Sequence, residues 1–282
     1  MGARRLLKNP LRDSLHAQPI ESVVRDFHRR LPGYAPTALR EAPRAATALR
    51  VRSVLVKDES HRLGMPSFKI LGASWATYRL LCQRLGRAPQ PIMGMTELAG
   101  LLAPYLPLEL VAATDGNHGR AVARMAGHLG LTAHILVPAN TASARIAALR
   151  SEGARVSVID GGYDDAVKAS AALAGERHLV VSDTSWPGYS EVPGWVIDGY
   201  ATIALEIEEQ LAQVQMPYPS VIALQMGVGA FAAAMVRHFQ GRTQIVGVEP
   251  TAADCVLASV QAGALTTIPG PQDSIMAGRE WS

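Results

Sequence analysis

Residues 109–138, ELVAATDGNHGRAVARMAGHLGLTAHILVP, contain a strand, a glycine-rich turn, a helix and a second strand in direct succession. ELVAAT (109–114) is an apolar run of strand length. In GRAVARMAGHLG (119–130), apolar side chains recur at helical spacing and Gly130 stands where a C-cap is expected. TAHILVP (132–138) is a second apolar run. This succession predicts two parallel strands joined by a helix.

The same alternation continues toward the C-terminus. Helices are expected at 141–153, 163–176, 196–214 and 230–240, and strands at 154–160, 178–183, 220–229 and 244–250. Thr141 is a candidate N-cap for the first of these helices. Before residue 60 one clear strand is expected, at 52–59, and coil is expected after residue 263. The fold class is therefore predicted to be α/β, with two α/β domains built on mainly parallel sheets.

The composition excludes several classes of protein. Of the 282 residues, 48% are hydrophobic and 18% are charged, which is enough apolar material for a sizeable core. The net charge is +3, and no lysine-rich run is interleaved with aromatic residues, so no nucleic-acid partner is predicted. Cys82 and Cys255 form no CxxC pair and fit a reducing, cytoplasmic location. Neither a membrane span nor a metal site is predicted.

Lys69 lies in MPSFKILGASWA (65–76), among apolar and small residues. Burial removes the hydration of an ammonium group and lowers its pKa. Lys69 is therefore expected either to extend to solvent or to lose its charge. A neutral lysine amine is a nucleophile that forms Schiff bases with carbonyl compounds.

A second glycine-rich turn ends the strand expected at 220–229. Gly227, Val228 and Gly229 directly precede a helix, whose free amide groups can bind a phosphate. The turn also fits a GxGxxA motif, with Glu249 placed 20 residues after Gly229 as in a dinucleotide site. A third interpretation is a tight turn in which glycine serves only close packing.

Polar side chains follow two of the expected strands. Thr114, Asp115 and Asn117 lie in the turn TDGNHG, at the strand end where α/β sheets bind ligands. Asp115 and Asn117 are equally typical of turns and helix caps. His118 has no second metal ligand at a suitable spacing and is interpreted as a packing or hydrogen-bonding residue. Asp183 follows another strand, at the same edge of a parallel sheet.

Five segments together resemble those of one enzyme family. They are FHRRLPGYAPTAL, VKDESHRLGMPSFKILGAS, ATDGNHGRAVA, VVSDTSWPGY and DSIMAG. The chain is similar, from about Asn9 to Ala277, to diaminopropionate ammonia-lyases, which have the tryptophan synthase β-like fold (fold type II) of pyridoxal phosphate enzymes. Relatives such as serine and threonine dehydratases usually have a neutral residue at the position of Asp115. The resemblance implies a small domain at 90–185 within a large cofactor-binding domain at 1–89 and 186–282.

The resemblance also implies roles for individual residues. Lys69 would bind pyridoxal phosphate as a Schiff base with Phe68 beside the ring, and Asn117 would bind the ring oxygen. The phosphate would be held by Gly227, Val228, Gly229 and Ala230. The substrate would face Thr114, Asp115 and Asp183, and the catalytic residues would be Lys69, Asp115 and Asp183.

The predicted function is pyridoxal phosphate-dependent α,β-elimination of 2,3-diaminopropionate to pyruvate and ammonia by a cytoplasmic homodimer. A serine/threonine-type dehydratase is the alternative within the same chemistry. A nicotinamide-dependent oxidoreductase would leave Lys69 without a role. A shortened relative with little or no activity is a further alternative, because family members continue beyond the element DSIMAG (273–278). The C-terminal part of the large domain is therefore expected to be missing.

Overall fold

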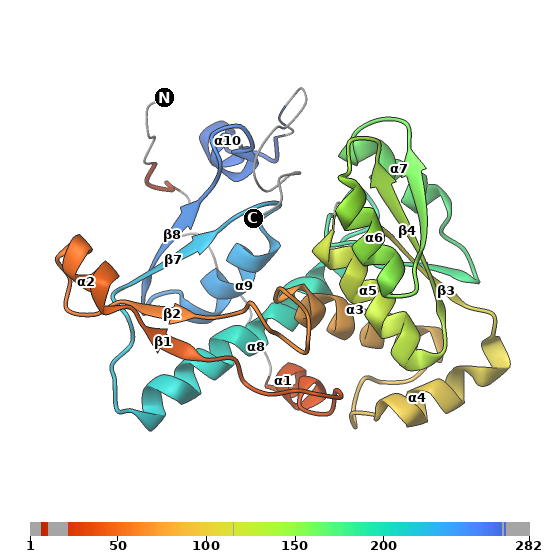
Figure 1. Cartoon of the computed structure of the whole chain (residues 1–282), viewed down its shortest axis with the longest axis horizontal. Helices are drawn as coiled ribbons and strands as arrows, with labels where there is room; N and C mark the ends of the chain where they lie inside the picture. The colour runs from red at the N-terminus through yellow and green to blue at the C-terminus, as the bar shows by residue number, and fades with distance from the viewer. Residues whose placement is uncertain (1–6, 11–21, 115, 267, 269–282) are drawn as a thin grey trace.

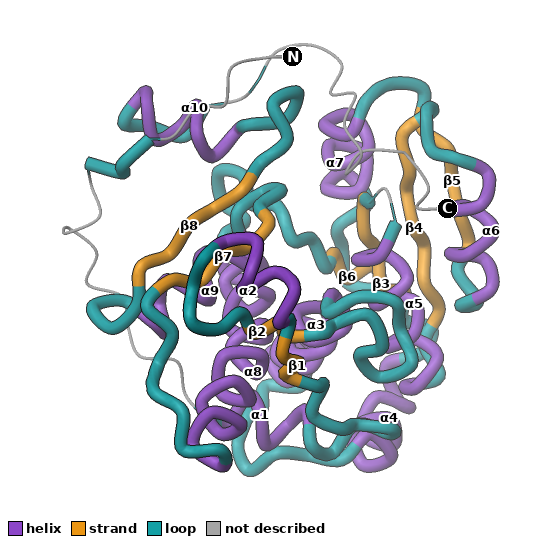
Figure 2. Tube along the Cα trace, turned by 60° about the vertical axis from the view of Figure 1, so that its left-hand side comes forward, coloured by secondary structure: helices purple, strands orange, loops and turns teal. Residues whose placement is uncertain are grey.

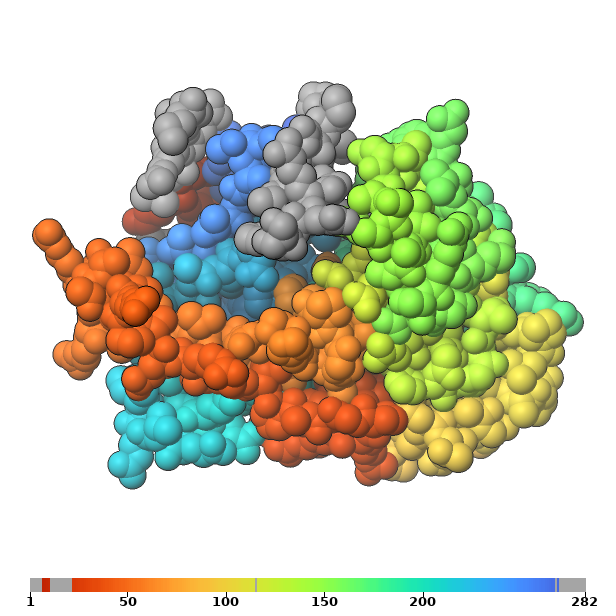
Figure 3. Space-filling model, in the orientation of Figure 1, coloured from red at the N-terminus to blue at the C-terminus, as the bar shows by residue number. Residues whose placement is uncertain are grey.

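The computed structural model describes residues 7–10, 22–114, 116–266 and 268. These residues form two adjacent α/β regions (Figure 1). One contains a four-stranded sheet, and the other surrounds the long helix α8 (Glu191–Gln213). The two regions are in direct contact (Figure 3). No helix in the described ranges is both long and apolar enough to cross a bilayer.

The four-stranded sheet is entirely parallel, as the sequence predicts. Its strand order is β5–β4–β3–β6 (Figure 2). The strands are β3 (Glu109–Ala113), β4 (Thr132–Pro138), β5 (Arg155–Ile159) and β6 (His178–Val180). The connecting helices are α5 (Asn117–Leu129), α6 (Ser143–Ser151) and α7 (Tyr163–Ala172). The bounds of β4 agree with the predicted strand, and α5 ends at Gly130 in the left-handed conformation, as predicted.

Both faces of this sheet are covered by helices. Leu110 and Ala112 of β3 belong to the same buried cluster as α5, whereas Val111 and Ala113 pack with Ala166 of α7. Successive strand residues point to opposite faces, so a strand buried on both sides is apolar at every position. This is why β3 reads as a continuous apolar run.

The structure corrects several predicted boundaries. Helix α6 begins at Ser143 with Ala142 as its N-cap, so the prediction of Thr141 as N-cap is wrong. The Thr141 amide instead donates to Pro138 O at 3.0 Å in the preceding turn. Helix α8 begins at Glu191, before the predicted residue 196, because a proline, Pro193, is tolerated in the first turn of a helix.

The second region contains two small sheets. Parallel strands β7 (Val221–Gln225) and β8 (Gln244–Val248) are joined by helix α9 (Ala230–Phe239), close to the predicted ranges. Strands β1 (Leu39–Glu41) and β2 (Leu55–Lys57) pair antiparallel, and β2 is shorter than the predicted strand at 52–59. The sequence did not predict the remaining elements, which are α1 (Val23–His28), α2 (Pro43–Leu49), α3 (Lys69–Arg84), α4 (Met95–Leu102), η2 (Ala103–Tyr105) and α10 (Cys255–Ala262).

Helices α3 and α8 cross at two glycines. A Cβ atom at Gly199 would lie 2.5 Å from the carbonyl oxygen of Leu71, and one at Gly72 would lie 2.6 Å from Cε1 of Tyr200. The absence of both side chains lets the two helices approach closely. Helix α3 also packs against α5 and so connects the two regions.

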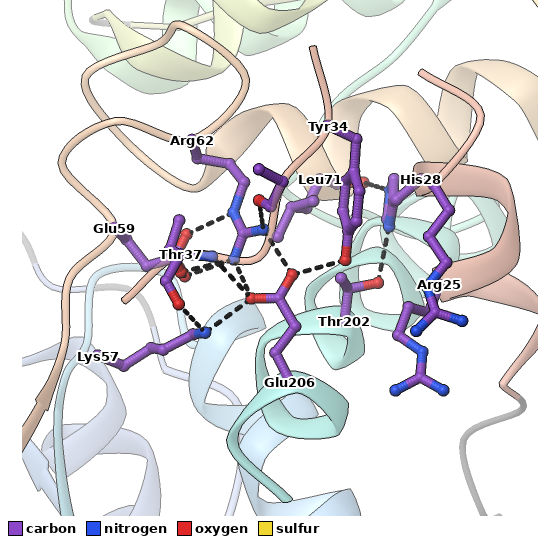
Figure 4. A network of polar contacts seen from close by, with 12 residues as sticks. Arg25, His28, Tyr34, Thr37, Lys57, Glu59, Arg62, Leu71, Thr202 and Glu206 are labelled. Atoms are coloured by element: carbon purple, nitrogen blue, oxygen red, sulfur yellow. Dashed lines mark hydrogen bonds and ion pairs between the residues drawn. The ribbon is translucent and has the colours of Figure 1, made fainter. Parts of the chain in front are cut away.

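A buried polar network attaches the segment before α3 to α8 (Figure 4). The side chains of Arg62 and Glu206 are 0% and 1% exposed, and Arg62 Nη1 lies 2.6 Å from Glu206 Oε1. Lys57 Nζ lies 2.7 Å from Glu206 Oε2, and the Tyr34 hydroxyl donates to Glu206 Oε1 at 2.7 Å. Burial alone would raise the pKa of Glu206, but hydrogen bonds from Arg62 and the charges of Arg62 and Lys57 lower it to about 2.

His28 joins three helices through its ring. Its Nδ1 lies 2.7 Å from Thr202 Oγ1 of α8, and its Nε2 lies 3.0 Å from the carbonyl oxygen of Leu71 in the first turn of α3. Burial lowers the pKa of His28 to about 3, so the ring is neutral at physiological pH. A carbonyl oxygen only accepts, so Nε2 carries the proton. His28 and the Arg62–Glu206 network together fix the start of α3.

Candidate active site

Lys69 is the first residue of α3, and its amine is held by a carboxylate. Its Nζ donates to Asp183 Oδ2 at 2.8 Å, and its side chain is 28% exposed. Burial alone would lower the pKa of Lys69, but the negative charge of Asp183 outweighs it and raises that pKa above its usual value. Lys69 is therefore held as an ammonium group by a partner that the sequence did not indicate, and the Schiff base that the resemblance implies stays a prediction.

The topology of the sheet explains how Asp183 reaches the site. Strands β3 and β6 are neighbours, so the loops after their carboxyl ends lie at one edge. Asp183 is in the loop after β6, and its side chain is 7% exposed. Burial alone would raise the pKa of Asp183, but the charge of Lys69 holds it well below its usual range. At this edge the structure therefore carries a charged Lys69–Asp183 pair.

His118, in the first turn of α5, lies beside Asp183. Its Nε2 lies 2.8 Å from the carbonyl oxygen of Val181 and must donate to it, and its Nδ1 lies 3.8 Å from Asp183 Oδ2. The prediction of a buried, hydrogen-bonding histidine is confirmed. No group of three or more His, Cys, Asp or Glu side chains suited to a metal occurs in the part of the chain that the structure describes.

The turn between β3 and α5 follows the strand beside β6 and carries the remaining polar candidates at the same sheet edge. Thr114 is buried, and its hydroxyl accepts a hydrogen bond from the Gly116 amide at 3.1 Å. Asn117 begins α5 and is exposed, so its amide group is open to a ligand. Asp115 lies outside the described residues.

The second glycine turn connects β7 to α9. Gly229 has φ +91°, a left-handed conformation that side chains other than glycine rarely adopt. Gly227 and Val228 are exposed, and Ala230 begins the helix. The first amide groups of a helix have no partners within the helix and favour an anion. This turn therefore has the donors that a phosphate group requires.

The resemblance implies that this turn holds the phosphate of pyridoxal phosphate. We therefore expect Gly229→Ala to weaken binding of that cofactor by roughly 10-fold, because the positive φ costs an alanine about 1–2 kcal/mol and the turn relaxes away from the phosphate-binding shape. Gly241→Ala is the matched control, since Gly241 has φ +74° with nothing within 4 Å of a Cβ. Spectral titration with the cofactor and denaturant unfolding measure the two effects. Both variants should lose similar stability. Equal cofactor affinity in the two variants would contradict the assignment.

Aromatic side chains connect Lys69 to the glycine turn. The ring of Phe68 lies 4.6 Å from that of Phe231, the second residue of α9, and 5.1 Å from that of Tyr200. Phe68 precedes Lys69 directly, so these contacts bring the lysine and the turn to one place. An amine, an amide-lined anion site and an asparagine amide form a donor set that fits pyridoxal phosphate.

Glu249 has a structural role in this fold. Its carboxylate accepts hydrogen bonds from the amides of Val256 and Leu257 at 2.8 and 2.9 Å, and so caps the start of α10. Each carboxylate oxygen thus accepts a hydrogen bond within the fold. This capping role accounts for Glu249 without a ribose, so its position 20 residues after Gly229 does not by itself favour a nicotinamide-dependent oxidoreductase.

Two features of the site were not predicted from the sequence. Tyr200 of α8 lies beside Lys69, whose Nζ is 5.9 Å from the centre of the tyrosine ring. The Arg62–Glu206 network supports the loop that leads to Lys69. Neither feature has a sequence signal of its own, because each depends on residues that are distant in the chain.

Comparisons with known proteins agree with this geometry. A family model described as "Pyridoxal-phosphate dependent enzyme" matches residues 30–280. The diaminopropionate ammonia-lyase of Salmonella typhimurium is 37% identical over 265 residues, which are 89% of this chain and 65% of that protein. The solved structure of diaminopropionate ammonia-lyase from Escherichia coli in complex with D-serine is 33% identical with a TM-score of 0.82, covering 90% of this chain and 67% of that chain.

A more distant relative is the biosynthetic L-threonine dehydratase of Pasteurella multocida. It is 30% identical over 166 residues, which are 59% of this chain and 31% of that protein. The chain thus spans 65% to 67% of the length of the diaminopropionate ammonia-lyases from Salmonella typhimurium and Escherichia coli. The similarity to them covers both regions of the fold.

Proposed function

Because the chain belongs to the family of pyridoxal-phosphate dependent enzymes, we propose that it converts 2,3-diaminopropionate to pyruvate and ammonia by α,β-elimination. The observation that carries the proposal is the ion pair between Lys69 Nζ and Asp183 Oδ2, at 2.8 Å. Asp183 already binds one ammonium group, and the β-amino group of diaminopropionate is a second ammonium group of similar size. The uncharged hydroxyl of serine or threonine offers no such match.

Four parts of the site would hold the cofactor in this proposal. Lys69 would bind it covalently, residues 227–230 would bind its phosphate, Asn117 would bind the ring oxygen, and Phe68 would lie beside the ring. When bound, pyridoxal phosphate supplies the electron sink that α-proton removal requires.

The protein's own groups would then move one proton and hold one charge. The amine of Lys69, once free and neutral, accepts the α-proton. Asp183 and Asp115 attract the β-ammonium group, which fixes the carbon–nitrogen bond that breaks. The β-nitrogen leaves as one ammonia, and hydrolysis of the remaining product gives pyruvate and releases the α-nitrogen as a second ammonia. Asp115 is included in this role because it stands between Thr114 and Gly116 in the sequence.

The direct test is to measure the pyruvate and ammonia formed from D- and L-2,3-diaminopropionate. L-serine and L-threonine are assayed separately as alternative substrates. Turnover of diaminopropionate at a higher kcat/KM than either hydroxy amino acid supports the proposal. Turnover of serine or threonine alone supports the dehydratase alternative. Cofactor binding without turnover of any of them supports the non-catalytic alternative.

We expect Asp115→Asn to keep the cofactor and to lose roughly 10- to 150-fold in kcat/KM on diaminopropionate, since a charge-assisted contact contributes about 1.5–3 kcal/mol. The activity on L-serine should change much less, because serine lacks the β-ammonium group. A loss beyond this range on one isomer alone would assign proton transfer to Asp115. Unchanged kinetics on both isomers would remove Asp115 from the mechanism.

We further propose a cytoplasmic homodimer with a small domain at 90–185 inside a large domain at 1–89 and 186–282. Both cysteines, Cys82 and Cys255, are free thiols, which supports a reducing compartment. Val221 and Val248, 49% and 55% exposed, are apolar surface that a second subunit can cover. Size-exclusion chromatography with light scattering tests the dimer.

A further inference from the structure

Tyr200 is a buried tyrosine whose hydroxyl has no hydrogen-bond partner among the described residues. Its ring is 0% exposed and packs edge-on against Phe68, with the centres 5.1 Å apart. Buried tyrosines normally bond their hydroxyl. Tyr78 does so, donating to the carbonyl oxygen of Pro89 at 2.8 Å, and Tyr189 does so with Val180 at the same distance. A phenylalanine would fill the space of Tyr200 equally well, so the hydroxyl calls for a partner that this arrangement of side chains does not bring within hydrogen-bond distance.

The nearest candidate for that partner is the amine of Lys69. Its Nζ lies 5.9 Å from the centre of the Tyr200 ring and donates to Asp183. A charged lysine has three donor hydrogens, so one bond to Asp183 does not exhaust it. Burial raises the pKa of Tyr200 to about 12 even though the charge of Lys69 opposes this, so the hydroxyl keeps its proton. Tyr163, another phenol whose charge acts on Lys69, already bonds to Thr184 Oγ1 at 3.1 Å.

We propose that Tyr200 is a positioning residue for Lys69, whose amine bonds to the Tyr200 hydroxyl when an ammonium group of the substrate occupies Asp183. This inference rests on the proposed function, because that substrate brings the competing ammonium group. Lys69 must be neutral to accept the α-proton, and a neutral amine is held less strongly by a carboxylate than an ammonium group is. The phenol oxygen accepts one N–H of the amine and leaves the nitrogen lone pair free to point at the substrate.

The surroundings of Tyr200 keep its hydroxyl in place for this role. The ring is confined by Phe68 and Phe231, and a Cβ at Gly72 would lie 2.6 Å from its Cε1. A hydroxyl on a ring that cannot move is preorganised and costs little entropy when it forms a bond. The Tyr200 hydroxyl is therefore a fixed acceptor to which the Lys69 amine can bond after it leaves Asp183.

The test is a double-mutant cycle with Tyr200→Phe and Asp183→Asn in the ligand-free full chain. The pKa of Lys69 is measured from the pH dependence of trace acetylation, followed by mass spectrometry of the peptide that contains it. While Asp183 is present, its charge is a larger cause of the raised pKa of Lys69 than Tyr200 is, so Tyr200→Phe should lower this pKa only slightly. In the Asp183→Asn background Lys69 turns to Tyr200, so the same change should lower the pKa by about one unit, a tenfold shift in proton affinity. Equal effects in both backgrounds, or none in either, would overturn the proposal.

Two further measurements keep the proposal testable if Asp183→Asn does not fold. Tyr200→Phe should leave the melting temperature of the ligand-free protein unchanged or raise it, because it removes an unpaired polar group. Tyr78→Phe, the matched control, should lower it by roughly 2–4 °C. In the cofactor-loaded enzyme, Tyr200→Phe should lower kcat by roughly 10-fold with KM within about twofold, whereas an unchanged kcat would refute the role. The titration contains no substrate, so its result is independent of whether the chain acts on diaminopropionate.

Discussion

Replacement of Lys69 by alanine is expected to lower kcat on 2,3-diaminopropionate by at least about 10³-fold, since a positioned base contributes about 10²–10⁴-fold and the covalent attachment of the cofactor is lost as well. Pyruvate formation measures the rate. The visible absorption of the protein with added pyridoxal phosphate, before and after borohydride reduction, measures the attachment. The variant should show no borohydride-stable incorporation of the cofactor.

Lys69→Arg is the matched control for this experiment. Arginine keeps a positive charge beside Asp183, which lies 2.8 Å from the lysine amine, but a guanidinium group remains protonated and forms no Schiff base under these conditions. Lys69→Arg should therefore be as inactive as Lys69→Ala and should be more stable, because Asp183 retains a counter-charge. Activity retained by Lys69→Ala would refute the role of Lys69. Inactivity of Lys69→Ala alone would reduce that role to charge.

Glu206→Ala should destabilise the fold severely, by about 3–5 kcal/mol in the free energy of unfolding, which is the usual cost of breaking a buried ion pair. It would leave Arg62, whose side chain is 0% exposed, with Glu59 as its remaining carboxylate partner, at 2.6 Å. Lys168→Ala is the control, because this lysine is 79% exposed and pairs with Asp165 at 3.8 Å. The control should change stability by no more than about 0.5 kcal/mol in urea unfolding.

The same glutamate makes the stability depend on pH in a predictable direction. The pKa of Glu206 is about 2 in the folded chain, against an ordinary value of 4.5. A carboxyl group whose folded pKa is lowered stabilises the fold above its unfolded pKa and loses that contribution as the pH falls toward its folded pKa. We therefore expect about 3 kcal/mol of stability to disappear between pH 4.5 and about pH 2. Glu206→Gln should lack this part of the acid transition, and an unchanged acid profile would show that the Arg62–Glu206 pair does not control it.

The central sheet was predictable from the sequence because its strands are short apolar runs, whereas in its helices the apolar residues recur at helical spacing. Strand β4 was predicted without error, and α5 was predicted to within two residues of its start. Helix α3 was not predicted, because eleven of its sixteen residues are buried and they surround the helix instead of forming one apolar stripe. A helix that is apolar on all sides gives no amphipathic signal.

The candidate site was only partly predictable for a related reason. The residue types and strand ends pointed to Lys69, Asn117 and Asp183, which local sequence can indicate. The ion pair of Lys69 was not predicted, because it depends on a carboxylate 114 positions later in the chain. Glu206 lies in the acidic run EIEEQ, and nothing local distinguishes it from its exposed neighbour Glu209. In both residues the role depends on contacts with side chains that are distant in the sequence, which local sequence does not indicate.

The separation in sequence of the paired residues also governs the kinetics of folding. Lys69 and Asp183 are 114 positions apart, and Arg62 and Glu206 are 144 positions apart. Closing such a long loop lowers the conformational entropy of the chain before the contact stabilises it. We therefore expect these contacts to form late on the folding pathway. Interactions absent from the transition state slow unfolding and leave the folding rate nearly unchanged. A molecule bound at Lys69 and Asp183 therefore prolongs the lifetime of the folded chain, while newly made chains reach that fold no sooner.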